Sequence, residues 1–199
     1  MNNSRFMIFA GLVFAFSLVA FGQGKATDQK MAMPGGVAGS FLRQSKYVQG
    51  QMESLLGAIP QDKFNWRPME GVRSIAEAFM HAGGGNYICS MHLGGTSPKG
   101  FEESAYEKSL TDKAQILEAL RLSFDAINEA VRKTPESNYD KHINFFGTDM
   151  TMLDMIFGAS NHQHELLGQQ ISYARMNGVV PPWTAERQKK MKENEMKKK

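Results

Sequence analysis

The chain has 199 residues, of which 42% are hydrophobic, and a formal net charge of +3. The apolar content is enough for one domain with a hydrophobic core, and the chain is too short for two domains to be expected. The positive charge is concentrated at one end, because residues 184–199 hold seven Lys or Arg and three Glu, a net of +4. The rest of the chain has no broad basic surface, so nucleic-acid binding is not expected.

The chain has a single cysteine, Cys89, so an intramolecular disulfide is excluded. No base close in sequence would activate this thiol. We therefore expect a buried, inert side chain rather than a nucleophile.

Residues 1–22 have the pattern of a secretory signal peptide. Arg5 gives a positive start, residues 6–21 are apolar or small, and Ala20 and Gly22 occupy the −3 and −1 positions of a cleavage site. The apolar run falls short of the roughly 20 residues that span a bilayer. We expect an exported protein, periplasmic or secreted, with no stable membrane anchor after cleavage; a retained anchor is the alternative.

Residues 23–39 are polar and contain several Gly, which predicts a flexible leader. The first helix is expected from Ser40, a favourable N-cap, to about Leu56. The second is expected from Ser74 to about residue 94, because Glu77 completes a capping-box pattern three residues after Ser74.

The third helix is expected to start at Thr111, where a hydroxyl can cap it, and to end before Pro135. The fourth is expected to start at Thr151, because Asp154 gives a second capping-box pattern. It should end before Gly178, which suits a left-handed C-cap.

No segment shows a convincing strict alternation of apolar and polar residues, so no sheet is expected. Helices of this length predict an all-α four-helix bundle over residues 40–183. The links 60–73 and 134–150 are long enough to permit crossovers, and they leave the order of the helices open. Residues 184–199 are expected to form a charged, disordered tail.

The fourth helix carries two histidines, and only one of them shares a face with other candidate ligands. At about 100° per residue, His164 points away from the stripe that contains His162. The position four residues after His162 is Leu166, which cannot ligate a metal. The position three residues after it is Glu165, which can.

The second helix carries His81 and His92 on one face, but about 16 Å apart along the axis, so they cannot share an ion. Glu77 lies four residues before His81, so these two side chains could bind one ion. Residues 83–85 are three consecutive glycines in mid-helix, which cost about 1 kcal/mol each relative to Ala. They indicate either a close helix approach or space for a ligand.

Two stretches of the sequence carry a family pattern. One is Trp66-Arg67-Pro68 with Gly71, Arg73-Ser74-Ile75, His81 and Asn86; the other runs from His162 through Gly168-Gln169, Tyr173-Ala174-Arg175-Met176-Asn177-Gly178 and Pro181-Pro182-Trp183. With Phe146-Gly147 before Thr151, these stretches resemble the DinB-like proteins. The resemblance covers about residues 40–183 and implies a four-helix bundle with long crossover connections.

The resemblance also implies a divalent metal held by three histidines. His81 matches the first ligand and His162 the second, but the third falls on Leu166. Glu165 could complete a weaker site, and Zn, Ni, Mn or Fe would suit such a donor set. The alternative is that both histidines are satisfied by hydrogen bonds to each other, to Asn86 or to Gln169.

The residues expected to line a cavity beside this pair are Glu77, Gly84, Gly85, Asn86, Gln169 and Tyr173. No catalytic residue is assigned. The expected function is an exported bundle with a degenerate histidine metal site that binds a small ligand or a partner without turnover. The alternative is a metal-dependent hydrolase or transferase that uses His81 and His162. A homodimer through a bundle face is a further expectation.

Overall fold

The computed structural model describes residues 34–197, so the predicted signal peptide and most of the predicted leader lie outside the described residues. The helices and strands are α1 (Gly36–Ala58), α2 (Ile75–His92), α3 (Glu103–Glu107), α4 (Lys113–Lys133), β1 (His142–Phe145), β2 (Thr148–Thr151), α5 (Met152–Met176) and α6 (Pro182–Lys197). Over this part of the chain, no helix has both the length and the apolarity needed to cross a bilayer.

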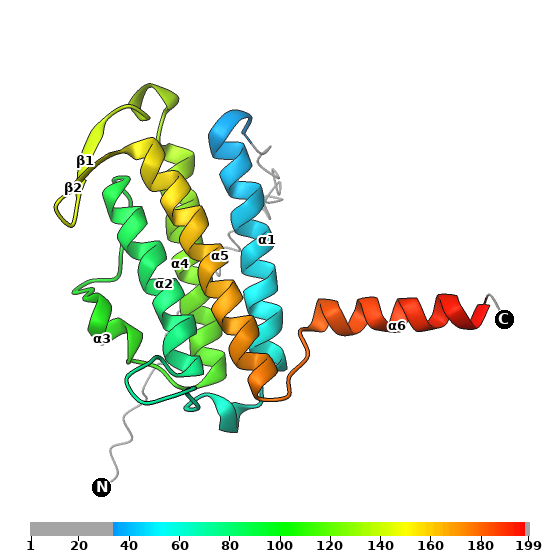
Figure 1. Cartoon of the computed structure of the whole chain (residues 1–199). Helices are drawn as coiled ribbons and strands as arrows, with labels where there is room; N and C mark the ends of the chain where they lie inside the picture. The colour runs from blue at the N-terminus through cyan, green and yellow to red at the C-terminus, as the bar shows by residue number, and fades with distance from the viewer. Residues whose placement is uncertain (1–33, 198–199) are drawn as a thin grey trace, which may run out of the picture. The chain divides into compact units, whose positions relative to one another are not determined.

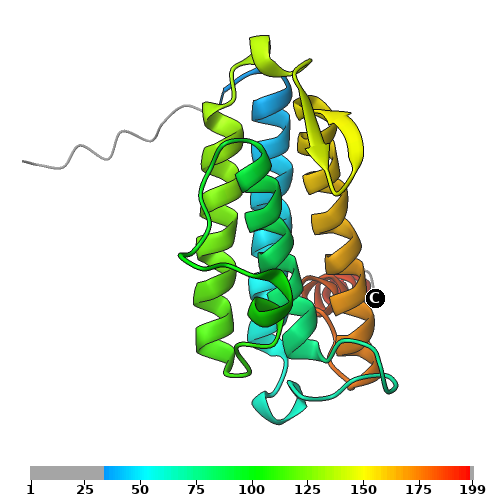
Figure 2. The same ribbon diagram turned by 90° about the vertical axis from the view of Figure 1, so that its left-hand side faces the viewer.

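The four long helices α1, α2, α4 and α5 form the predicted bundle (Figures 1 and 2). α1 and α2 each pack against both α4 and α5, so α1 lies diagonal to α2 and α4 lies diagonal to α5. α2 and α4 run in the same direction. The link between them, residues 93–112, therefore returns along the outside of the bundle and brings α3 against α2. This is the crossover, although the sequence pointed to the links 60–73 and 134–150.

The capping patterns of α2 and α5 are confirmed. Glu77 N donates to Ser74 Oγ at 3.2 Å, and Ser74 N donates to Glu77 Oε2 at 2.7 Å. Asp154 and Thr151 make the same reciprocal pair at the start of α5. Gly178 has φ +74°, the left-handed conformation that the end of this helix requires.

Two other helix starts differ from the prediction. α1 begins at Gly36 rather than Ser40, because Val37 and Ala38 already pack on the core, and this part of the predicted leader is helical. The hydroxyl of Ser40 accepts from Arg43 inside the helix instead of capping it. α4 is capped by Asp112 rather than Thr111, since Asp112 Oδ1 accepts from the backbone of the third helical residue at 3.0 Å.

The expectation that there is no sheet is wrong for one short hairpin. β1 and β2 pair antiparallel, with His142 opposite Thr151 and Phe145 opposite Thr148. Phe146 and Gly147 form the turn with φ +50° and +87°. Two successive positive φ values are the requirement of the tight hairpin turn, and Gly147 meets it without strain. Each strand has only four residues, too few for alternation to be recognised.

The predicted disordered tail is also wrong over its described part, because α6 runs through it. Pro182 takes the first helical position, where its missing N–H costs nothing. The segment that follows is rich in Glu, Lys and Met, which are good helix formers. Lys190 and Glu186 add an ion pair one turn apart.

The core consists of two apolar clusters. The larger includes Met52, Phe79, Phe124 and Leu166. The smaller includes Phe41, Cys89, Ile127 and Met155, and the hairpin packs on it. The candidate site lies where α2, α3, α5 and the hairpin meet.

Candidate functional site

His81 on α2 and His162 on α5 face each other between these two neighbouring helices. Their ring centroids are 5.2 Å apart and the ring planes are at 79°. Gly85 allows this approach, because a Cβ added there would overlap the His162 ring, with Cδ2 at 2.5 Å. The neighbouring Gly84 is less constrained: a Cβ there would meet Glu103 and Tyr106 at ordinary contact distances of 3.5 and 3.6 Å.

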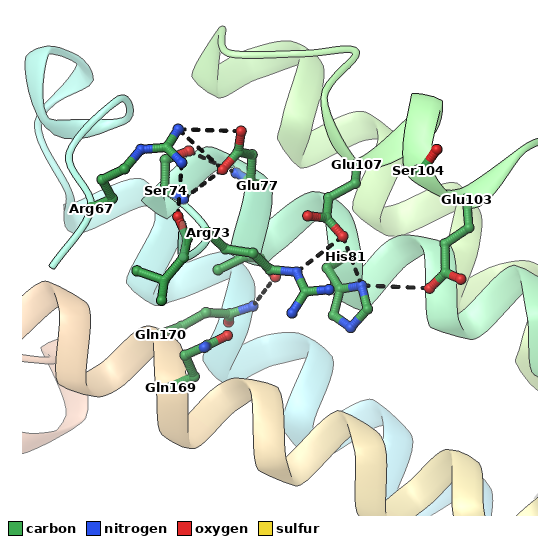
Figure 3. A network of polar contacts seen from close by, with 12 residues as sticks. Arg67, Arg73, Ser74, Glu77, His81, Glu103, Ser104, Glu107, Gln169 and Gln170 are labelled. Atoms are coloured by element: carbon green, nitrogen blue, oxygen red, sulfur yellow. Dashed lines mark hydrogen bonds and ion pairs between the residues drawn. The ribbon is translucent and has the colours of Figure 1, made fainter. Parts of the chain in front are cut away.

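Two carboxylates from α3 reach His81 from the other side (Figure 3). His81 Nδ1 lies 3.1 Å from Glu107 Oε2 and 3.5 Å from Glu103 Oε1. Neither contact is aligned as a hydrogen bond, so the buried Nδ1 atom faces both carboxylates without a hydrogen-bond partner. α3 is a single turn whose start is capped by Glu102, which accepts from the backbone of Ser104 and Ala105.

Arg73 completes this network from the link before α2. Its Nε lies 3.0 Å from Glu107 Oε2, the same oxygen that contacts His81 (Figure 3). Arg73 thus supplies the positive charge of the cluster, and the sequence had indicated it only as part of the family resemblance.

Both imidazoles are held neutral by their surroundings. Burial lowers the pKa of His81, and the positive charges of Arg73 and of a protonated His162 lower it further, against an opposing effect of Glu107. Burial also lowers the pKa of His162; the charge of Glu165 opposes this and Arg73 adds to it. Burial and the neighbouring Glu107 raise the pKa of Glu103. At pH values just below about 6.5, the usual pKa of a histidine, the folded protein therefore resists protonation of either imidazole.

The residues present do not fit the metal that the resemblance implies. Leu166 is only 4% exposed and packs in the larger core cluster, so the third ligand position is filled by an apolar side chain. Glu165 is exposed and does not complete the set with His81 and His162. Among residues 34–197, no group of three or more His, Cys, Asp or Glu is arranged to hold a metal ion. The predicted set of His81, His162 and Glu165 is corrected accordingly.

The predicted cavity residues separate into three groups. Gly84 and Gly85 lie at the histidine pair, as described above. Asn86 is instead a core residue: its amide donates to Ser123 Oγ at 3.2 Å, and its Oδ1 accepts from Gln163 at 2.9 Å. It therefore binds neither histidine.

The remaining three, Glu77, Gln169 and Tyr173, lie on the far side of His81 from the hairpin. Glu77 pairs with Arg67 at 3.2 Å, and Gln169 donates to Tyr173 Oη at 3.3 Å. They line a hollow of about 490 Å³, here called the polar pocket, with Arg67, Gly71, Val72, Arg73, Glu107 and Lys108. Its charged side chains are mostly paired with one another.

A second hollow, here called the apolar pocket, lies on the hairpin side and has a volume of about 230 Å³. Its lining is mostly apolar: Gly85, Ile88, Cys89, Glu103, Phe145, Phe146, Met150, Asp154, Met155, Gly158 and His162. Gly85 therefore serves both roles that the sequence left open for the triple glycine, close approach and space.

Cys89 lies in the wall of the apolar pocket. It is buried, and burial raises the pKa of its thiol to about 12, with a further contribution from the charge of Glu103. Only the thiolate is a strong nucleophile, so this cysteine is an inert part of the wall.

The DinB superfamily profile matches residues 44–169. This is more than half of the chain, and the chain belongs to the DinB superfamily. A comparison with curated proteins gives no match.

Solved structures agree in fold. A DinB-like protein from Bacillus cereus is 19% identical with a TM-score of 0.60, and one from Bacillus subtilis is 17% identical with a TM-score of 0.56; each alignment covers 71% of this chain and 93% of the other. A mycothiol-dependent maleylpyruvate isomerase is 14% identical with a TM-score of 0.54, over 65% of this chain and 59% of the other. At these identities the likeness concerns the fold alone.

Sequence reasoning missed the residues that surround the histidines from outside the four helices. Glu103 and Glu107 come from the crossover, and Phe145 and Phe146 come from the hairpin. The one available signal for the carboxylates is their spacing of four residues, which places both on one face of a helical turn.

Proposed function

We propose that this protein binds a small, largely apolar molecule in the apolar pocket and does not turn it over. The observation that carries the proposal is the pocket itself, a mostly apolar hollow beside a half-buried histidine pair, with two carboxylates, Glu103 and Asp154, in its wall. Ligand sites are concave and mostly apolar, with a few polar groups that fix the ligand's orientation.

The volume limits the size of the ligand. A cavity of about 150 Å³ holds benzene, so the 230 Å³ available here suits one ring with a short substituent. Larger ligands would have to displace Phe146, which is 75% exposed at the tip of the hairpin.

The pocket lacks an activated nucleophile. The Cys89 thiol has a raised pKa, and His162 Nε2 is buried against Gly85 without a hydrogen-bond partner. A general base must lie within hydrogen-bond reach of the proton that it removes. Binding without turnover is therefore the function that this arrangement supports best.

The test uses benzyl alcohol as a probe and two matched glycine variants of α5. We expect millimolar binding or somewhat tighter, which corresponds to about −4 kcal/mol or below, measured by ligand-observed NMR. Gly158→Leu should abolish it, because Gly158 lines the apolar pocket and has no heavy atom within 4 Å of its missing Cβ.

Gly168→Leu is the control. Gly168 is exposed on the same helix, has the same open space at its Cβ, and does not line the apolar pocket. Both variants replace a helical glycine by a better helix former, so both should fold. Unchanged binding in Gly158→Leu, or no binding by the wild type, would overturn the proposal.

The alternative is a metal-dependent hydrolase or transferase that uses His81 and His162. It would require a metal held by two histidines and no third protein ligand, since Leu166 is apolar and buried. Near-stoichiometric zinc on the purified wild type, lost in His162→Ala, would favour this alternative. Zinc bound only by Leu166→His would show that the pair converges but lacks a ligand in the natural chain.

A further inference from the structure

We infer that the apolar pocket selects a small aromatic or aliphatic amine in its protonated form, with Glu103 as the partner of the ammonium group. This inference rests on the proposed function and specifies its ligand. It follows from the charges that line the pocket and from those that line its neighbour.

The ionisable groups in the wall of the apolar pocket are acidic or neutral. Glu103 and Asp154 are its two carboxylates, and no Lys or Arg is among its lining residues. Cys89 and His162 carry no charge at neutral pH. The lining itself therefore attracts a ligand cation and repels a ligand anion. The one positive charge that reaches Glu103 and His162 from outside the lining is that of Arg73, which is paired with Glu107.

Glu103 lacks a cation of its own. Within the described range 34–197, its one close contact with a basic side chain is with His81 Nδ1, at 3.5 Å, and that imidazole is neutral. The Arg73 guanidinium makes its ion pair with Glu107 rather than with Glu103 (Figure 3), and its charge partly offsets the rise in the pKa of Glu103 that burial and Glu107 cause. The Glu103 side chain is 36% exposed, so it is accessible to a ligand and partly shielded from water. Charge-assisted hydrogen bonds in such partly shielded places are among the stronger polar contacts.

Asp154 has a different role. Its Oδ2 accepts from Thr151 N and from Thr151 Oγ1, at 2.9 and 2.7 Å, to cap α5. These hydrogen bonds lower the pKa of its carboxyl group, which therefore keeps its charge while holding the helix start. Asp154 adds to the negative potential of the pocket, and Glu103 is the carboxylate that remains available for contact.

The hairpin supplies the surface for the rest of the ligand. Phe145 and Phe146 line the pocket with ring centroids 4.7 Å apart, and the His92 ring meets Phe145 edge to face, with centroids 5.1 Å apart. Aromatic edges and faces pack against a phenyl or short aliphatic group, and their faces also attract an ammonium. In the polar pocket, by contrast, the carboxylates Glu77 and Glu107 are already paired with Arg67 and Arg73, and Lys108 adds a positive charge, so no free carboxylate is offered to the same ligand.

The test is a set of four probes of nearly equal size: benzylamine, benzyl alcohol, toluene and benzoate. On the wild type at pH 7, we expect benzylamine to bind about tenfold more tightly than benzyl alcohol, because it makes one charge-assisted contact more. Benzoate should bind most weakly of the four. Dissociation constants are measured by ligand-observed NMR with the full-length protein.

Two variants locate the effect. Glu103→Gln keeps the size of the side chain and should bring the ratio of benzylamine to benzyl alcohol affinity close to one. Glu118→Gln is the control, because Glu118 is exposed on α4 and does not line the apolar pocket, so the ratio should stay unchanged.

The possible failures are distinguishable. Equal binding of benzylamine and benzyl alcohol to the wild type would refute the amine preference and leave the proposed function standing. A preference that survives Glu103→Gln would refute the role of Glu103. Binding of none of the four probes would refute the proposed function itself.

Discussion

Gly84 and Gly85 provide a matched pair of substitutions that tests the packing of the histidine pair. Both lie in the middle of α2, and replacing either by Ala gains about 1 kcal/mol of helix propensity. They differ in what an added methyl group meets. At Gly84 it meets Glu103 and Tyr106 at ordinary distances, and at Gly85 it overlaps the ring of His162.

Gly84→Ala should therefore stabilise the protein by up to about 1 kcal/mol, a rise in Tm of about 2–4 °C for a domain of this size. Gly85→Ala should lose that gain, because overpacking a filled site costs about 1–3 kcal/mol. The free energies of unfolding of the two variants, measured by thermal or urea denaturation, should therefore differ by about 1–3 kcal/mol. His162 lines the apolar pocket, so a displacement of its ring in Gly85→Ala should also weaken benzyl alcohol binding.

Equal stabilisation by both variants would refute this account, because it would mean that His162 does not pack on Gly85. Destabilisation by Gly84→Ala would instead contradict the finding that a methyl group fits at that position at ordinary contact distances.

Three further outcomes follow. The pKa values of His81 and His162 are lowered by burial and by Arg73, so the unfolded chain takes up protons before the folded protein does as the pH falls below about 7. The free energy of unfolding should therefore decrease toward pH 5, and urea unfolding should show a shallower decrease in the double variant His81→Gln, His162→Gln. Cys89, with its thiol pKa raised to about 12, should react with iodoacetamide at pH 8 only as fast as the protein opens, and rapid alkylation of the folded state would contradict its burial. If residues 1–22 are a cleaved signal peptide, mass spectrometry of the protein exported by a bacterial host should find Gln23 at the N-terminus, and a membrane-bound protein that retains the segment would contradict this.

The sequence predicted best what depends on neighbours close along the chain. The capping pairs Ser74–Glu77 and Thr151–Asp154 need only residues three apart, and both form. The left-handed residue after α5 was predicted in the same way, from Gly178 alone. The bundle followed from helix lengths and apolar stripes, which are also local features.

The parts that could not be predicted depend on contacts between distant segments. Asn86 was expected beside the histidines, but Gln163 and Ser123 on two other helices hold it in the core. Glu103 and Glu107 meet His81 only because the crossover brings α3 back along α2. Strands of four residues and a helix in a strongly charged segment gave no periodic signal, so the hairpin and α6 were missed.

The most direct test of the central claim uses the ε-methyl NMR signals of methionine during a benzyl alcohol titration. Met150 and Met155 line the apolar pocket, whereas Met52 and Met80 lie in the larger core cluster. A ligand in the apolar pocket should shift the signals of Met150 and Met155 in a saturable way and leave those of Met52 and Met80 in place. Shifts confined to Met52 and Met80, or no shift at any of the four, would contradict the claim that this protein binds small molecules in the apolar pocket.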